Sequence, residues 1–170
     1  MEIHRFERLW LALSLLLILG ITGTVVYGAT AEGIKMVDDS GGTIDAENLQ
    51  DTEFGDPGVR KVGENRYDVY IVAHRFFFDP GTSQPIEIPA ESTVTFYVTS
   101  ADVVHGFQVA DTNVNTMVIP GQVAKLTVEF DNPDSYGIIC HEYCGSGHHS
   151  MEGELDVVPK SEYNATEASA

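Results

Sequence analysis

An uncharged, apolar segment near the N-terminus places the strongest constraint on how this chain folds. No residue from position 9 to position 31 carries a charge, and Leu, Ile and Val dominate the run as far as Tyr27. A helix needs about 20 predominantly apolar residues to cross the hydrocarbon core of a bilayer. We therefore expect a single transmembrane helix over residues 9–31, with residues 1–8 as a short terminus on one side.

The charges that flank this segment predict its orientation. Arg5 and Arg8 precede it, whereas Glu32, Asp38 and Asp39 follow it. Positively charged flanks stay on the cytoplasmic side of a membrane. The N-terminus is therefore expected in the cytoplasm, and the body of the chain on the extracytoplasmic side of the cell membrane.

A cleaved signal peptide is the alternative use of the same segment. Residues 29–31 read Ala-Thr-Ala, which is a small-residue cleavage pattern. The apolar run is longer than the about 7–15 residues of a signal-peptide core, which favours an uncleaved, single-pass anchor. Both interpretations export the rest of the chain.

Beyond the anchor, composition divides the chain into three parts. Residues 32–66 mix Gly, Asp, Glu and Asn with scattered apolar residues. Such a segment cannot bury enough apolar surface to fold alone, so we interpret it as an acidic linker. Residues 160–170 are small and polar and predict a flexible tail. Residues 67–159 remain, and they suffice for one ordinary domain.

The segment at residues 67–159 has the pattern of β-structure. In residues 93–99 and 123–130 apolar side chains alternate with polar ones, as they do in half-buried strands. Further short apolar runs, separated by turn residues, cover residues 67–72, 107–109, 116–119 and 154–158. We predict an all-β domain, an antiparallel Greek-key sandwich or barrel, preceded by the transmembrane helix.

The chain is strongly acidic. It has 26 Asp and Glu against 9 Lys and Arg, for a formal net charge of −17. Nucleic acid is excluded as a partner, because its binding depends on basic patches that neutralise phosphates. Self-repulsion of this size is tolerated where salt screens it, which predicts a halophilic source.

A metal-binding pattern occupies residues 140–151, which contain the 2 cysteines of the chain together with histidines and a methionine. Thiolate, imidazole and thioether are soft ligands that select copper, as in cupredoxin sites. A mononuclear blue copper site uses one cysteine, whereas Cys140 and Cys144 lie on one short loop and can bridge two ions. The segment is a candidate for a dinuclear copper centre.

Two other uses of these residues compete with copper. A disulfide between Cys140 and Cys144 would suit an exported domain, but it leaves His148, Met151 and the distant His105 without a role. A structural zinc site could use two cysteines and two histidines. A thioether adds nothing to zinc but is a natural weak copper ligand, so the methionine favours copper.

These residues resemble a known family, the cytochrome c oxidase subunit II family, which is the copper A subunit of heme-copper terminal oxidases. The copper A loop of that family reads Cys-x-Glu/Gln-x-Cys-x-x-x-His-x-x-Met, and residues 140–151 match every spacing. Its Ser-x-Asp-Val-x-His motif is matched by residues 100–105. The resemblance covers residues 67–158, and the single transmembrane span is similar to the B-type branch.

The resemblance implies a cupredoxin-like fold and a set of metal ligands. Cys140 and Cys144 would bridge two copper ions, and the remaining ligands would be His105, Glu142 through its backbone carbonyl, His148 and Met151. The family spacing favours His148 over the neighbouring His149. His141 occupies a position that varies in the family and receives no role.

Two further roles come with the resemblance. In part of the family the side chain at the position of Glu142 helps to bind Mg²⁺ at the contact with subunit I, and a carboxylate suits that hard ion. Phe76 and Phe78 belong to an aromatic run that matches a stretch through which electrons enter. Core packing is expected for at least one ring of this run, since aromatic side chains dominate core burial.

The resemblance also implies an activity. The chain would be a subunit of a cytochrome c oxidase-type terminal oxidase that takes electrons one at a time from a small donor, a cytochrome c or a blue copper protein. It would pass them to heme in subunit I, where O₂ is reduced to water. The alternative is a membrane-anchored cupredoxin that carries electrons or copper outside an oxidase with the same ligands.

Overall fold

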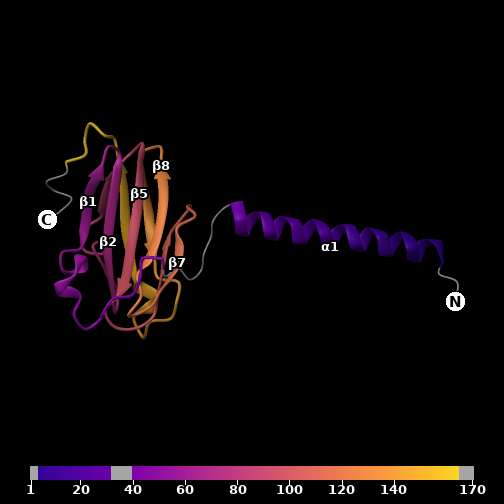
Figure 1. Ribbon diagram of the computed structural model, residues 1–170, viewed down its shortest axis with the longest axis horizontal. Helices are drawn as coiled ribbons and strands as arrows, with labels where there is room; N and C mark the ends of the chain where they lie inside the picture. The colour runs from indigo at the N-terminus through magenta and orange to yellow at the C-terminus, as the bar shows by residue number, and fades with distance from the viewer. Residues whose placement is uncertain (1–3, 32–39, 165–170) are drawn as a thin grey trace. The chain divides into compact units, whose positions relative to one another are not determined.

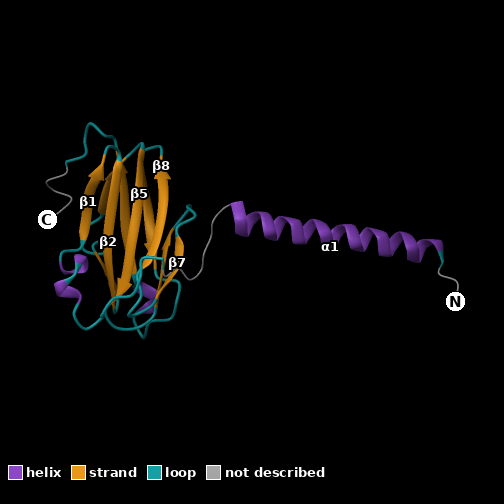
Figure 2. Cartoon of the chain, viewed as in Figure 1, coloured by secondary structure: helices purple, strands orange, loops and turns teal. Residues whose placement is uncertain are grey.

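The computed structural model describes residues 4–31 and 40–164. Figure 1 shows two parts, a long helix and a β-domain, and Figure 2 shows that strands make up most of the second part. The predicted fold class, an all-β domain preceded by one helix, is confirmed.

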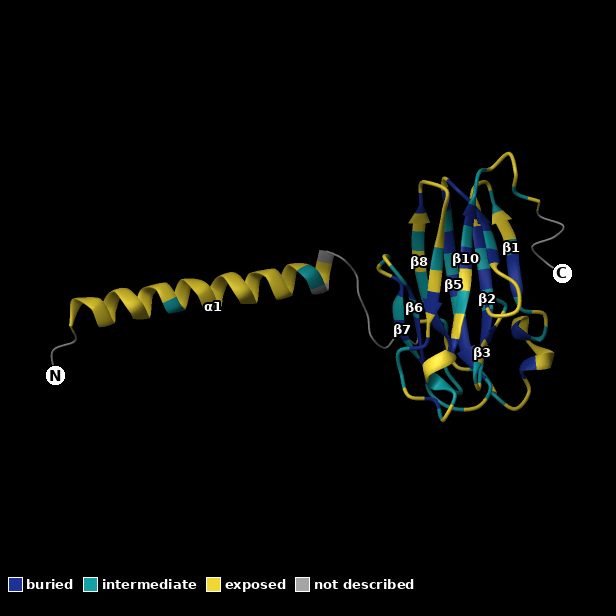
Figure 3. Ribbon diagram, turned by 180° about the vertical axis from the view of Figure 1, so that it is seen from behind, coloured by how far each residue is buried: buried dark blue, intermediate teal, exposed yellow. Residues whose placement is uncertain are grey.

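Helix α1 (Arg5–Ala31) contains the predicted transmembrane segment and begins earlier than predicted, at Arg5. Its side chains are exposed along almost the whole length (Figure 3). The part from Arg5 to Gly28 contains an 18-residue stretch with a mean hydropathy of 2.3, and it is long and apolar enough to cross a membrane. The Thr24 hydroxyl donates to the carbonyl of Ile21 at 2.8 Å, so this polar group is satisfied inside the helix, as a bilayer requires.

The β-domain consists of two five-stranded sheets, which Figure 1 shows as two layers. One sheet has the order β1-β2-β5-β8, with β3 paired to β2, and the other has the order β4-β10-β9-β6-β7. The strands are β1 (Gly58–Gly63), β2 (Arg66–His74), β3 (Phe77–Asp79), β4 (Ile86–Pro89), β5 (Ser92–Ser100), β6 (His105–Val109), β7 (Asn115–Val118), β8 (Ala124–Phe130), β9 (Asp134–Ile139) and β10 (Glu152–Val158).

The core lies between the two sheets. Successive side chains of each strand point to opposite faces, and the apolar ones point into this space. Val94, Phe96 and Val98 of β5 are fully buried, as the period of two predicted. Phe96 meets Phe107 of β6, in the opposite sheet, with ring centroids 5.9 Å apart. Figure 3 shows that buried residues occur along many of the strands.

Two strand pairings are parallel, in contrast to the predicted antiparallel arrangement. β5 runs parallel to β2, and β4 runs parallel to β10. Parallel neighbours cannot be joined by a tight hairpin and need a crossover connection. The chain between β2 and β5 makes such a crossover, because it passes through β4 in the other sheet.

Four strands, β1, β3, β4 and β9, were not predicted. β3 and β4 have only 3 and 4 residues, which is too short to display an alternation. In β9 only Ile138 is buried, so its sequence lacks the apolar pattern of a core strand. Their hydrogen-bonded neighbours, rather than their own side chains, define these strands.

The prediction of a linker over residues 32–66 is wrong for its described part. Residues 40–66 contain two short helices, η1 (Leu49–Asp51) and η2 (Glu53–Gly55), and strand β1. Leu49 and Phe54 are buried in a small cluster with residues from β2 and from the loop before β8. The scattered apolar residues of this segment become ordered by packing against a sheet formed by other parts of the chain. The linker prediction considered only the composition of the segment itself, so it missed this contribution. Residues 32–39 lie outside the described residues.

The prediction of a flexible tail over residues 160–170 is also wrong in its first part. Tyr163 packs edge-on against Tyr67 of β2, with ring centroids 5.5 Å apart. Lys160 pairs with Glu91 at 2.9 Å. These two contacts attach the start of the tail to the sandwich, while residues 165–170 lie outside the described residues.

Candidate metal centre

The loop at residues 140–151 connects two neighbouring antiparallel strands. β9 ends at Ile139 and β10 begins at Glu152, and these two residues face each other in the β9–β10 register. The ladder continues one step into the loop, because the backbone N–H of Cys140 donates to the carbonyl of Met151 at 3.3 Å. The loop is therefore closed at its base by the sheet. β6, which also pairs with β9, begins at His105 and brings that histidine to the same end.

The sulfur and nitrogen atoms of the predicted ligands converge. The two cysteine Sγ atoms are 3.9 Å apart. His105 Nδ1 lies 3.8 Å from Cys140 Sγ, and His148 Nδ1 lies 3.7 Å from Cys144 Sγ. Met151 Sδ lies 3.6 Å from Cys144 Sγ, and the Glu142 carbonyl oxygen lies 3.3 Å from Cys140 Sγ. The structure thus brings together all six predicted ligands.

A tight turn positions the second half of the set. Gly145 has a φ of +135°, a conformation that side-chain-bearing residues rarely adopt. The short helix η3 (His148–Ser150) follows, and the N–H of Met151 donates to the carbonyl of His148 at 3.2 Å. Residues three apart in such a turn lie on the same side, which places His148 and Met151 together at Cys144. His149, the competing histidine, is exposed.

The geometry separates copper from the two alternatives. A disulfide requires an S–S distance of about 2.05 Å, and Cys140 and Cys144 are both free at 3.9 Å. Both cysteines are only 3% exposed, and Met151 is 2% exposed, so three sulfurs face one dry site. A buried thioether among thiolates is a copper environment rather than a zinc environment.

The two thiols differ in acidity. Burial by itself would raise the pKa of Cys140, but hydrogen bonds from His105 and from the backbone of Gly106 outweigh it and lower the pKa to about 6. Burial and the neighbouring Cys140 raise the pKa of Cys144 to about 11. A metal must displace the proton of the second thiol when it binds, which couples metal affinity to pH.

Asp102 positions His105, a role that the sequence pattern did not assign. Its carboxylate accepts hydrogen bonds from His105 Nε2 at 2.8 Å and from the backbone N–H groups of Arg75 and Val103 at 2.8 and 2.6 Å. Nε2 therefore carries a proton, and Nδ1, the ring nitrogen that faces Cys140, is the one left to bind a metal. Carboxylates commonly fix metal-binding histidines in this way. The sequence feature that could have indicated this role is the position of Asp102 inside the Ser-x-Asp-Val-x-His motif.

The aromatic run divides between the core and the copper loop. Phe78 is fully buried and packs edge-on against Phe107 at 5.6 Å, so it belongs to the core, as expected for at least one ring of this run. Phe76 lies against the loop instead. A Cβ atom on Gly145 or Gly147 would come within 3.0 or 2.6 Å of its ring, so the two glycines permit this approach.

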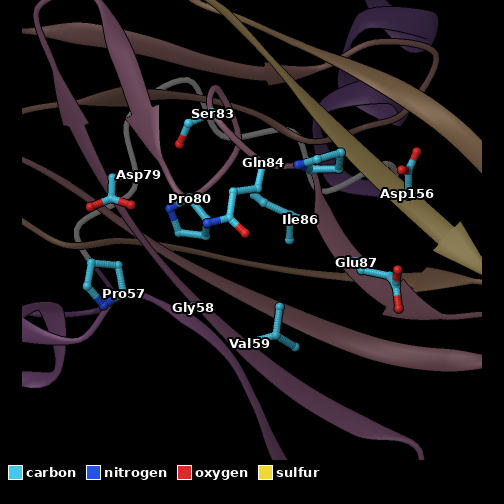
Figure 4. Close-up of a pocket in the computed structure, with 11 residues that line it drawn as sticks. Pro57, Gly58, Val59, Asp79, Pro80, Ser83, Gln84, Ile86, Glu87 and Asp156 are labelled. Atoms are coloured by element: carbon cyan, nitrogen blue, oxygen red, sulfur yellow. The ribbon is translucent and has the colours of Figure 1, made fainter. Parts of the chain in front are cut away.

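The cavity in Figure 4 is a separate feature of the β-domain. It has a volume of about 250 Å³ and is lined by residues of β1, β4 and β10, with prolines and the carboxylates of Asp79, Glu87 and Asp156. None of the predicted ligands lines it. The soft ligands thus gather at the β9–β10 loop and not in this cavity.

Comparisons with known proteins identify the family of this chain. The family described as cytochrome c oxidase subunit II, periplasmic domain, matches residues 63–158. A cytochrome c oxidase subunit 2 of Thermus thermophilus is 35% identical over 163 residues, which cover 89% of this chain and 91% of that protein. Another protein of that name, also from Thermus thermophilus, is 42% identical over 110 residues, or 64% of this chain and 79% of the relative.

Solved structures give the same result. A chain in a cryo-EM structure of a heme-copper terminal oxidase dimer aligns with a TM-score of 0.70 and 36% identity, covering 91% of this chain and 100% of that chain. The periplasmic domain of subunit II of cytochrome oxidase from Bradyrhizobium japonicum aligns over 56% of this chain and 86% of its own, with a TM-score of 0.52 and 19% identity, which supports the fold alone. The chain belongs to the cytochrome c oxidase subunit II family, the electron-accepting subunit of heme-copper terminal oxidases.

Proposed function

We propose that this subunit accepts electrons at a dinuclear copper A centre held by His105, Cys140, the Glu142 carbonyl, Cys144, His148 and Met151. The observation that carries the proposal is the paired arrangement of the ligands. Each cysteine has one histidine at its own side, His105 at 3.8 Å and His148 at 3.7 Å.

The spacing of the sulfurs fits two ions. A thiolate–metal bond is about 2.3 Å long, which exceeds half of the 3.9 Å between the two Sγ atoms. Both sulfurs can therefore reach an ion on either side of the line that joins them. Met151, a third soft donor next to Cys144, and the Glu142 carbonyl oxygen next to Cys140 would supply further ligands.

The protein contributes ligands, orientation and a dry environment. Copper, when bound, supplies one-electron oxidation and reduction. Asp102 holds His105 in the tautomer that leaves Nδ1 free, and burial of Cys140 and Cys144 excludes water from the sulfurs. The ligands come from β6 and from the β9–β10 loop, whose base is closed by the sheet, so the protein would hold them in one arrangement around the metal.

The partners follow from the family. Subunit I, which carries heme, receives the electrons and reduces O₂ to water. The donor is a small cytochrome c or blue copper protein on the extracytoplasmic side, with residues 1–8 in the cytoplasm, as Arg5 and Arg8 indicate. Glu142 offers a carboxylate for Mg²⁺ shared with subunit I. Phe76, at the loop that carries Cys144, is the candidate for electron entry.

Two measurements test this function. Purification of the complex from native membranes, followed by heme and copper analysis, should recover the chain with a heme-bearing subunit; recovery without heme would favour a membrane-anchored cupredoxin outside an oxidase. The full-length chain should bind two copper ions and turn purple, and Cys144→Ser should abolish the dinuclear spectrum. One copper ion per chain with a single intense blue band would contradict the dinuclear proposal.

A further inference from the structure

Two residues without an assigned role form a flat contact beside the candidate ligands. Gly106 follows His105 at the start of β6, and His141 follows Cys140 after the end of β9. A Cβ atom on Gly106 would lie 2.6 Å from each of Cγ, Nδ1 and Cε1 of the His141 ring. Three ring atoms at one distance mean that the imidazole lies face-on against the glycine. Only a residue without a side chain fits there.

The register of the sheet explains the contact. β6 pairs with β9 through Gln108 opposite Ile139 and Val109 opposite Ile138. Continued toward the loop, this antiparallel register sets Gly106 opposite His141. Because successive side chains of a strand alternate, the neighbour His105 points inward while position 106 faces outward. Gly106 is nevertheless buried, since the imidazole covers it.

Packing, rather than hydrogen bonding, accounts for the contact of His141. Its Nε2 atom is buried and has no hydrogen-bond partner among the described residues. A ring of the same shape without that nitrogen would lose no hydrogen bond there. The shape of the ring is therefore the property that matters at this contact.

Gly106 also acts on a ligand directly. Its backbone amide interacts with the Cys140 thiol and helps to lower the pKa of that thiol. Hydrogen bonds to a metal-bound sulfur, together with the exclusion of water, tune the reduction potential of such centres. A shift of the backbone at position 106 would therefore move both the amide next to Cys140 and the adjacent ligand His105.

We propose that the stack of His141 on Gly106 is a positioning device that fixes the spacing between the strand carrying His105 and the loop carrying Cys140, and thereby sets the reduction potential of the centre. The proposal rests on the proposed copper centre. Loss of the stack lets water reach the sulfur of Cys140 and weakens its interaction with the Gly106 amide. Both changes favour the oxidised, more highly charged state, so the potential falls.

The test uses the full-length chain in detergent, both metal-free and loaded with copper. Gly106→Ala is expected to lower the reduction potential, alter the thiolate-to-copper absorption bands and lower the melting temperature of the metal-free chain. The double variant Gly106→Ala/His141→Ala removes the clashing ring and should recover at least half of the loss in melting temperature. His141→Phe keeps a flat ring and should retain the wild-type potential, and His149→Ala is the matched control in the same loop.

The outcomes separate the positioning role from a purely structural one. If Gly106→Ala does not fold, His141→Ala must still lower the potential of the loaded chain, and an unchanged potential overturns the proposal. A double variant no better than Gly106→Ala overturns it as well. The copper count of the wild-type chain tests the dinuclear centre independently, and the melting temperatures of the metal-free variants test the stack even when that count is not two.

Discussion

The packing of residues 40–56 onto the sandwich predicts a definite loss of stability when Phe54 is truncated. The Phe54 side chain is 4% exposed and meets the ring of Tyr70 edge-on at 5.4 Å. It shares a cluster with Leu49, Val72 and Val123, so it joins the segment before β1 to β2 and to the loop before β8. The Phe54→Ala variant removes the larger of the two buried apolar side chains, Leu49 and Phe54, that attach this segment.

The magnitude follows from the burial of the ring. Truncation of a buried phenylalanine to alanine costs about 3–5 kcal/mol, and sites that can collapse lie at the lower end. The cluster is small and lies at the outer face of the sheet, so we expect about 3 kcal/mol. For a domain of this size each kcal/mol lowers the melting temperature by about 3–5 °C, which gives a decrease of about 10 °C.

The assay is thermal unfolding of the full-length chain in detergent, followed by circular dichroism at one fixed copper loading, since bound metal stabilises the folded state by itself. Val62→Ala is the control, because Val62 of β1 is 49% exposed and its truncation should change the free energy of unfolding by less than about 0.5 kcal/mol. If Phe54→Ala melts like the control, residues 40–56 are a linker and their packing contributes nothing.

Four further predictions follow. His148→Ala should destroy the copper spectrum while His149→Ala leaves it nearly intact, and the reverse result would show that the register of the ligand loop is wrong. Asp102→Ala should weaken copper binding by about 10–100-fold in competition titrations, because His105 loses its orienting partner; wild-type affinity would contradict that role. Burial raises the pKa of Tyr163 to about 12 from 10.0, so its neutral form stabilises the fold below pH 10 and that stability is lost as the pH rises toward 12; Tyr163→Phe should reduce the alkaline loss. The net charge of −17 predicts a higher melting temperature in molar KCl, where the Debye length is about 3 Å, than in dilute buffer; a flat or falling dependence would remove the halophile inference.

Some features were accessible from sequence because they depend on residues close together in the chain. α1 follows from one uncharged run, and the alternation in β5 predicted which of its side chains enter the core. Five of the six predicted ligands lie on one hairpin loop, so their spacing alone limits the ways in which they can converge. His105 was the exception, and its motif rather than its distance from the loop identified it.

The tertiary structure decided everything that depends on contacts between distant segments. Whether Leu49 and Phe54 belong to a linker or to the domain depends on the sheet that receives them. The choice between Phe76 and Phe78 depends on β3, whose pairing with β2 turns Phe78 inward. The tautomer of His105 depends on Asp102, and the stack of His141 on Gly106 depends on the β6–β9 register. Local sequence sets which side chains are available, but only the relative placement of strands far apart in the chain determines which of them meet.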